Sequence, residues 1–185
     1  MNSLRIQELI QVHRDGLLKN VIPFWMAHVR DPECGGYLHY LDRDGSVYHT
    51  DKSVWIQCRI AWMFALLYND VARRPEWLAM SLQGIEFIEK HCFDTDGRMF
   101  FEVTREGHPL LKRRYLFAEN FGVIAFAEYG RAATFNRQSS ISFALIFGIH
   151  RNCGLLFHAV PAVGTQSFLG QADCRHHVIQ RLILQ

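Results

Sequence analysis

A pattern of helix, hairpin and helix occurs twice before Phe135, and it constrains the fold more than any other feature. Each copy has glycine turns around a short apolar run, followed by a helical run. Asp-Gly between apolar residues is a strong hairpin signal, because glycine accepts the positive φ that such a turn requires. The turns are Gly35-Gly36 and Asp44-Gly45 in the first copy, and Asp96-Gly97 and Glu106-Gly107 in the second. The pattern predicts a repetitive α-helical architecture with hairpins at one end.

Apolar residues at helical spacing predict four helices in residues 1–135. Pro23 should kink the first helix or mark the start of a new turn. Asp51 is a plausible start for the second helix, since an acidic side chain suits the positive end of the helix dipole. The predicted helices span 3–28, 51–74, 75–92 and 116–134.

Composition limits the classes of protein to which the chain can belong. With 185 residues, of which 49% are hydrophobic, the chain is long enough for one globular domain with a sizeable core. The net charge of +2 and the mixing of basic with acidic residues argue against a nucleic-acid-binding surface. The basic cluster at 112–114 is interpreted as a solvated loop before a helix. We therefore expect no nucleic-acid partner.

Cysteines and hydropathy indicate a soluble, cytoplasmic chain. The five cysteines are odd in number and scattered, and no CxxC pair occurs, so neither a disulfide framework nor a zinc site is predicted. The N-terminus is polar where a signal peptide needs an apolar segment, and no run of about 18 apolar residues appears. We expect no membrane span, no metal and no cofactor.

The sequence changes character after Phe135. Residues 136–185 contain one acidic residue, Asp173, and no lysine, and 141–149 are apolar without a polar helical face. We therefore divide the chain into residues 1–135, part of a helical domain, and an atypical tail, residues 136–185. The tail is either an alternative end of the domain or a segment translated out of frame or wrongly spliced.

Six short motifs carry a resemblance to a known family. The most specific is Lys-x-x-Trp-x-Gln-x-Arg at residues 52–59, and five further matches stand in the same order: Phe24-Trp25, Gly35-Gly36-Tyr37, Leu41–Gly45, Pro75–Leu78 and Phe117–Phe121. In these residues the chain resembles the N-acylglucosamine 2-epimerase family over roughly residues 8 to 135.

The resemblance implies an all-α (α/α)6 toroid, a ring of six helical hairpins, of which this chain supplies about the first two pairs with short β-hairpins. It implies an isomerase scaffold that acts on a small-molecule sugar, as in N-acetylglucosamine 2-epimerase, cellobiose 2-epimerase and ketose-aldose isomerases. Full-length relatives are expected to form homodimers. Some members are also known as renin-binding proteins, so a non-catalytic binding protein is an alternative.

Epimerisation at C2 removes a weakly acidic proton next to a carbonyl, so it needs a base, an acid on the other face and a donor for the developing oxyanion. The resemblance implies that two histidines are the acid and base and that an arginine contacts the open-chain sugar oxygens. Arg59 matches that arginine, and its guanidinium offers a fixed fork of donors. The alternative for Arg59 is an ion pair at the end of a buried helix.

Two further residues are candidates for sugar binding. Trp55 lies one helical turn before Arg59 and could stack on a sugar ring, although aromatic residues at this spacing are often core. Glu119 lies in a matching string, but Ala118 replaces the Ser or Thr of relatives, and Glu119 could instead pair with Arg59. Gln57 points to another face, which favours a structural hydrogen bond.

No histidine here can be assigned as the acid or the base. The adjacent His176 and His177 would point about 100° apart on a helix, and no motif surrounds them. The other candidates are interpreted as ordinary surface histidines without metal-ligand spacing: His28, His39, His49, His91 and His108. The expectation is an inactive fragment of a sugar epimerase, with the particular sugar unspecified.

A third possibility is another α/α-toroid enzyme, such as an unsaturated glycoside hydrolase, which needs a pair of carboxylates as acid and base. Asp94 and Asp96 are the available pair. Their place in a hairpin turn gives them the simpler role of turn residues.

Overall fold

The computed structural model describes residues 3–113 and 115–136, so the tail from residue 137 lies outside the described residues. Of the described residues, 3–23 belong to one compact unit, and 24–113 with 115–136 belong to a second. In the first unit, α1 (Ser3–Asp15) continues into a π-helix, η1 (Gly16–Val21). The next helix along the chain, α2 (Ile22–His28), has most of its residues in the second unit. The predicted helix over 3–28 is confirmed.

Pro23 explains why the helical hydrogen bonding changes along this segment. Proline has no N–H and cannot continue the i to i−4 ladder, so it is tolerated in the first turn of a helix. It is the second residue of α2, directly after the π-helix η1. The π-helix was not predicted, because the sequence pattern does not separate i+4 from i+5 hydrogen bonding.

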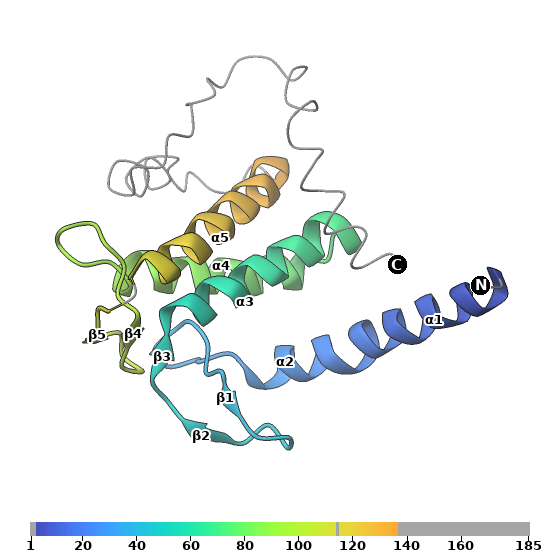
Figure 1. Ribbon diagram of the computed structural model, residues 1–185, viewed down its shortest axis with the longest axis horizontal. Coiled ribbons are helices and arrows are strands. Elements are labelled where there is room, and N and C mark those ends of the chain that lie inside the picture. The colour runs from blue at the N-terminus through green and yellow to red at the C-terminus, as the bar shows by residue number, and fades with distance from the viewer. Residues whose placement is uncertain (1–2, 114, 137–185) are drawn as a thin grey trace, which may run out of the picture. The chain divides into compact units, whose positions relative to one another are not determined.

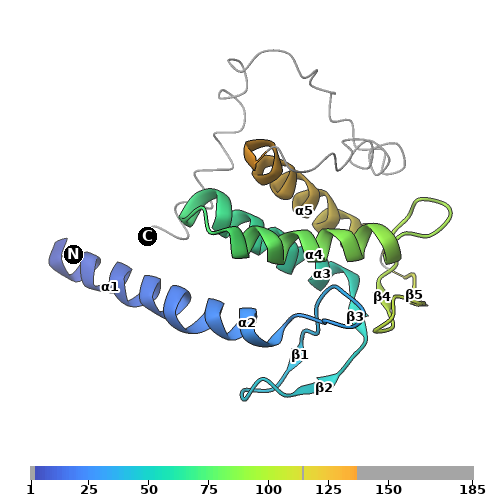
Figure 2. The same cartoon turned by 180° about the vertical axis from the view of Figure 1, so that it is seen from behind.

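Three helices form the core of the second unit (Figures 1 and 2). α3 (Val54–Leu66), extended by the π-helix η2 (Leu67–Val71), packs against both α4 (Pro75–His91) and α5 (Tyr115–Asn136). The buried apolar side chains of the three helices include Val54, Phe64, Trp77, Ile85, Ile88 and Phe126. The predicted helices from Pro75 and over 116–134 are confirmed, and the predicted end near 73–74 lies just beyond η2.

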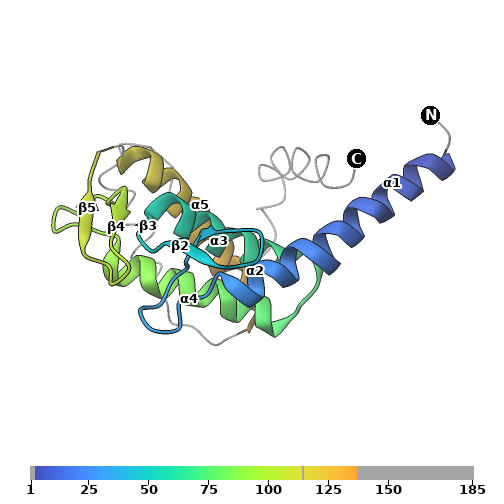
Figure 3. The same ribbon diagram turned by 90° about the horizontal axis from the view of Figure 1, so that it is seen from below.

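Short strands pair next to the N-terminal ends of α3 and α5 (Figures 1 and 3). β1 (Tyr40–Leu41) pairs antiparallel with β2 (Val47–His49). A second sheet has the order β3 (Lys52–Ser53), β4 (Glu102–Val103) and β5 (Pro109–Leu111). The glycines of the two hairpin turns, Gly45 and Gly107, have φ of 87° and 96°, which confirms the predicted turns.

The predicted start of the second helix at Asp51 is wrong. Lys52 and Ser53 form strand β3 and pair with Val103 and Glu102, and α3 begins one residue later, at Val54. The pairing partners come from the second copy of the repeat, so local propensity at Asp51 could not reveal them.

The two copies of the repeat share one register, an offset of 62 residues. In the first hairpin, the Asp42 N–H donates to the Ser46 carbonyl at 2.9 Å. In the second hairpin, the Thr104 N–H donates to the His108 carbonyl at 2.8 Å, 62 positions later at both ends. The same offset relates the N-terminal turns of α3 and α5. The repeat read from the sequence is therefore a repeat of backbone hydrogen bonding.

Candidate functional site

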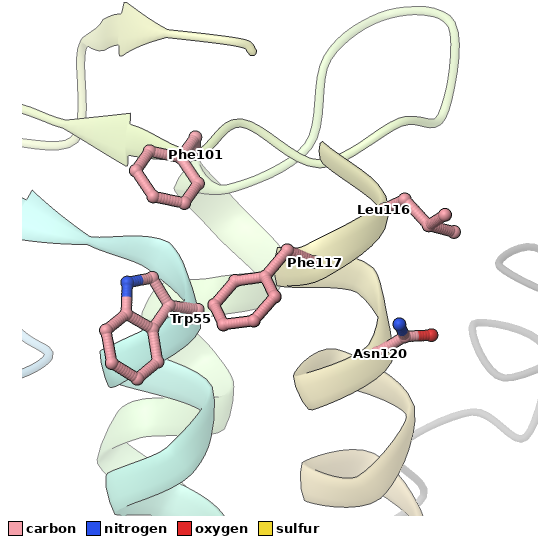
Figure 4. Close-up of a pocket in the computed structure, with 5 residues that line it drawn as sticks. All are labelled: Trp55, Phe101, Leu116, Phe117 and Asn120. Atoms are coloured by element: carbon pink, nitrogen blue, oxygen red, sulfur yellow. The ribbon is translucent and has the colours of Figure 1, made fainter. Parts of the chain in front are cut away.

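An open, mainly apolar pocket of about 560 Å³ lies at the N-terminal ends of α3 and α5. Figure 4 shows the indole of Trp55 on α3 facing the ring of Phe117 on α5, with Phe101 approaching from the segment before β4. Leu116 and Asn120 complete the lining. Aromatic rings with a few polar groups at a rim are the usual surface on which proteins hold small ligands.

The repeat explains why two aromatic rings meet here. Trp55 and Phe117 are 62 positions apart, so each stands in the first turn of its helix, and their ring centroids lie 5.4 Å apart. Phe121, one turn further along α5, lies 5.6 Å from Trp55 and 5.2 Å from Phe117. The three rings form an aromatic cluster in which edge and tilted contacts are favourable.

Arg59 lies next to this aromatic cluster. Its guanidinium carbon is 5.9 Å from the centroid of Phe121, and the residue is exposed. Within residues 3–113 and 115–136, no carboxylate forms an ion pair with Arg59. The described residues therefore do not form the buried ion pair that was the alternative role for Arg59. Arg59 does not line the pocket itself, and its guanidinium offers hydrogen-bond donors beside the aromatic cluster.

Glu119 occupies a different environment. It is 2% exposed, its Oε1 lies 2.9 Å from Arg98 Nε, and it accepts a hydrogen bond from the Met99 N–H at 3.3 Å. Its repeat counterpart, Gln57, accepts from the Tyr37 N–H at 2.8 Å and confirms the predicted structural hydrogen bond. Glu119 does not line the pocket and forms no ion pair with Arg59, so its carboxylate holds the start of the second hairpin.

A buried ionic cluster fixes the hairpin that carries Phe101. Lys52 is fully buried and donates from Nζ to Asp31 Oδ2 at 2.9 Å, to the Gly35 carbonyl at 2.7 Å and to the Arg105 carbonyl at 2.7 Å. Arg105 closes the cluster with two 3.0 Å hydrogen bonds to Asp31. All three ammonium hydrogens of Lys52 are thus satisfied, as burial of a charge demands.

Burial and pairing act in opposite directions on these groups. Burial raises the pKa of the Asp31 carboxyl, but hydrogen bonds from Arg105 and Lys52 outweigh it and hold that pKa well below its usual range. For Lys52, burial dominates and lowers the pKa despite the hydrogen bond to Asp31. Asp31 is therefore ionised at neutral pH, which makes the cluster sensitive to acid.

His39 differs from the other histidines. Both of its ring nitrogens are buried, its ring stacks on Tyr40 with centroids 4.2 Å apart, and burial lowers its pKa to about 4. The prediction that His39 is an ordinary surface histidine is wrong, because both ring nitrogens are buried and the ring lies against Tyr40 of β1. His39 is therefore neutral in the folded protein at neutral pH.

We expect His39 to lower the free energy of unfolding in mild acid. Below pH 6.5 an unfolded chain protonates this histidine, whereas the folded protein, with its pKa of about 4, does not. The free energy of unfolding should fall between pH 6.5 and 4, by at most about 3 kcal/mol at 1.36 kcal/mol per pH unit. Urea unfolding of His39→Phe across this range should give a flatter profile. The exposed His108→Phe is the control, and an unchanged slope in His39→Phe would contradict the prediction.

Neither a metal site nor a catalytic carboxylate pair has support in the described part of the chain. Residues 3–113 and 115–136 contain no group of three or more His, Cys, Asp or Glu that could hold a metal ion. Asp94 and Asp96 both contact Lys112, at 2.5 and 2.6 Å, as expected for turn residues in an ion pair. No described helix combines the length and apolar character needed to cross a membrane. His176 and His177 lie outside the described residues.

Sequence reasoning found Trp55 but missed the rest of the pocket. Phe101, Phe117 and Asn120 line it, and Phe121 lies beside it. A signal was present, because the offset of 62 places Phe117 opposite Trp55 in the repeat. Applying the repeat register residue by residue would have identified the α5 half of the site.

The fold and the site define a class: an α-helical protein built from repeated helical pairs, with an open aromatic pocket and an exposed arginine beside it. The family model described as N-acylglucosamine 2-epimerase (GlcNAc 2-epimerase) matches residues 36–148. The chain belongs to the N-acylglucosamine 2-epimerase family.

Individual relatives agree with this assignment. The chain is 36% identical over 132 residues to N-acylglucosamine 2-epimerase of Bos taurus, covering 68% of this chain and 31% of the relative. It is 29% identical to cellobiose 2-epimerase of Dictyoglomus turgidum, covering 70% and 33%. A crystal structure of a sugar epimerase from a ruminal bacterium matches with a TM-score of 0.66 at 27% identity, covering 78% and 37%. The chain thus spans about a third of the length of these relatives.

Proposed function

We propose that this chain is part of a cytoplasmic sugar 2-epimerase or isomerase and that it binds a small sugar at the Trp55 pocket without converting it. The observation that carries the proposal is Arg59, an exposed guanidinium without a carboxylate partner among the described residues, beside an aromatic cluster. A cation left available next to aromatic rings suits a ligand that has both hydroxyl or carbonyl oxygens and a flat apolar face.

Each residue has a role in the proposed site. Trp55 and Phe117 pack against the sugar, and Arg59 donates hydrogen bonds to the open-chain oxygens near C2. Glu119 supports the site from behind, since its carboxylate holds Arg98 and the start of the second hairpin. Proton transfer at C2 needs a base and an acid, and we assign neither to a residue of this chain. The proposed chain is therefore an inactive fragment of the family's scaffold.

The binding proposal is tested by titrating the chain with N-acetylglucosamine, mannose and cellobiose and following saturation-transfer NMR. We expect weak binding of at least one sugar, because the pocket is open. Arg59→Met should weaken that binding about 10- to 100-fold, since hydrogen bonds from a charged group contribute about 1.5–3 kcal/mol.

The chain offers a matched control in Arg74, an exposed arginine whose guanidinium carbon lies 4.8 Å from the Trp77 ring centroid, outside the pocket. Arg74→Met should leave sugar binding unchanged. Equal losses in Arg59→Met and Arg74→Met, or no saturation transfer from any of the three sugars, would contradict the proposed site.

The second candidate is a non-catalytic binding protein of the same family. It is favoured by the same absence of an assigned acid and base, and it predicts a protein partner rather than a product. A pull-down that retains a defined protein partner while sugars bind without turnover would support it. Loss of that partner on Arg59→Met would instead link partner binding to the sugar pocket.

A further inference from the structure

The two hairpins share one backbone register, but only the second contributes to the pocket. Phe101 lines the pocket, whereas the ring of His39, 62 positions earlier, lies against Tyr40. The strands next to Phe101 are short: β3 and β4 have two residues each, and the register of β4 with β5 shifts between Glu102 and Val103. Short ladders open locally more readily than a packed core. The wall of the pocket that Phe101 forms, here called the Phe101 wall, therefore depends on further contacts to stay ordered.

Arg105 supplies such a contact at the tip of the second hairpin. Its Nε and Nη2 each donate at 3.0 Å to one of the two carboxylate oxygens of Asp31, which lies 74 positions earlier in the chain. The side chain of Asp31 is 0% exposed and that of Arg105 is 27% exposed. A planar guanidinium bound to both oxygens of a buried carboxylate is fixed in direction as well as in distance. The hairpin tip is thus tied to the loop that precedes the first hairpin.

The first hairpin has no equivalent tie. Arg43 stands 62 positions before Arg105, at the same place in its own hairpin, and it is exposed. Among the described residues, the side chain of Arg43 forms no ion pair. The repeat alone would treat the two arginines alike, so it does not account for the difference. The hairpin whose tip is tied is the hairpin that lines the pocket.

The buried charge of Asp31 does not depend on Arg105 alone. Without the guanidinium, Asp31 Oδ2 still accepts from Lys52 Nζ at 2.9 Å. Its Oδ1 still accepts from the backbone N–H groups of Glu33 and Cys34, at 3.1 and 3.2 Å. The carbonyl of residue 105 that binds Lys52 belongs to the backbone, so any side chain at this position retains it. Removing the Arg105 side chain therefore leaves no buried charge unpaired, and the fold should survive.

We propose that Arg105 is a positioning residue of the pocket: its paired hydrogen bonds to Asp31 keep the Phe101 wall ordered before a ligand binds. The proposal rests on the sugar site proposed above. Arg105 does not line the pocket, so it acts through Phe101, which stands directly before β4 (Figure 4). A wall that is ordered in advance loses less conformational entropy on binding, which strengthens the binding of the sugar.

The first test compares amide hydrogen exchange in the full chain with that in Arg105→Met, followed by NMR without sugar. Two amides report on the Phe101 wall, because the Phe101 N–H donates to the Leu111 carbonyl at 2.7 Å and the Val54 N–H donates to the Phe101 carbonyl at 2.9 Å. Both should exchange about 10-fold faster in the variant, since the wall then opens locally more often. Amides in the middle of α4 should change by a smaller factor, whereas a general loss of stability would accelerate all of them alike.

The second test titrates the same variant with N-acetylglucosamine, mannose and cellobiose. Arg105→Met should weaken sugar binding about 2- to 10-fold, as expected when a binding surface must be ordered by the ligand. Arg43→Met, at the corresponding place in the first hairpin, is the matched control and should leave exchange and binding unchanged. Glu33→Gln should also change little, because Glu33 pairs with Arg105 at 2.9 Å but its side chain is 71% exposed.

Three results would overturn the proposal. The first is unchanged exchange of the Phe101 and Val54 amides in Arg105→Met. The second is acceleration by the same factor throughout α4, which would show that Arg105 serves stability alone. The third is selective acceleration with unchanged affinity for a sugar that the unmodified chain binds. If the unmodified chain binds none of the three sugars, the proposed sugar site is refuted, and hydrogen exchange by itself then decides whether Arg105 orders the Phe101 wall.

Discussion

We expect no measurable 2-epimerase or aldose-ketose isomerase activity from this chain, even though Arg59, which we propose contacts the sugar, is exposed beside the aromatic cluster. The reaction requires removal of the proton at C2 and its return from the opposite face. Arg59 can stabilise an oxyanion, but it cannot accept a proton, because the guanidinium is always charged.

The size of the expected loss follows from the acid and the base, neither of which we assign to a residue of this chain. A placed acid or base contributes about 10²- to 10⁴-fold to the rate, so a site without both should turn over near background. Oxyanion stabilisation does not compensate, because the enolate that it would stabilise never forms without a base.

The assay is incorporation of deuterium at C2 of N-acetylglucosamine, N-acetylmannosamine, mannose and cellobiose in heavy water. Exchange at the rate of the protein-free control is the expected result. Exchange well above it that is lost in Arg59→Ala, and also on changing His176 or His177, would show that the tail completes a working site and would refute the proposal of an inactive fragment.

The second large effect concerns stability. Lys52→Met should lower the free energy of unfolding by about 3–5 kcal/mol, because it removes one partner of a buried ion pair. The lost ammonium serves Asp31 and the carbonyls of Gly35 and Arg105, and Met cannot donate to any of the three. The melting temperature should fall by roughly 6–12 °C or more.

The second copy of the repeat supplies the control. Lys112 contacts Asp94 and Asp96 in the second hairpin, but its side chain is 37% exposed, whereas the side chain of Lys52 is 0% exposed. Lys112→Met should therefore cost at most about 1 kcal/mol, as for exposed ion pairs. Urea unfolding followed by circular dichroism at pH 7 compares the two variants. Similar losses in both would show that burial does not set the strength of the Lys52 pair.

Acid should weaken the same buried ionic cluster by protonating Asp31, the partner of Lys52. Asp31 has a depressed pKa in the folded protein, so its stabilising contribution is present above the ordinary aspartate pKa of about 3.9 and is lost as the pH falls below that value. The contribution of Asp31 is lost at lower pH than that of His39. Profiles of the free energy of unfolding against pH therefore distinguish the two groups.

The sequence by itself determined the repeat, the hairpin turns and the family. Glycine at Gly45 and Gly107 is dictated locally, since each has positive φ, and helices over 75–91 and 115–136 follow from apolar periodicity and Pro75. The six motifs between Phe24 and Phe121 were enough to indicate the family, and the match of the family model to residues 36–148 confirms it.

Only the tertiary structure decided the environments of individual side chains. Lys52 looked like part of a helix start, but its place in β3 and its burial depend on Val103 and Arg105, which lie some 50 residues away in sequence. Glu119 and Arg59 could have formed a pair on neighbouring helices. Packing instead buried Glu119 against Arg98 and left Arg59 exposed beside Phe121, because which helix faces meet is set by long-range contacts that no local pattern encodes.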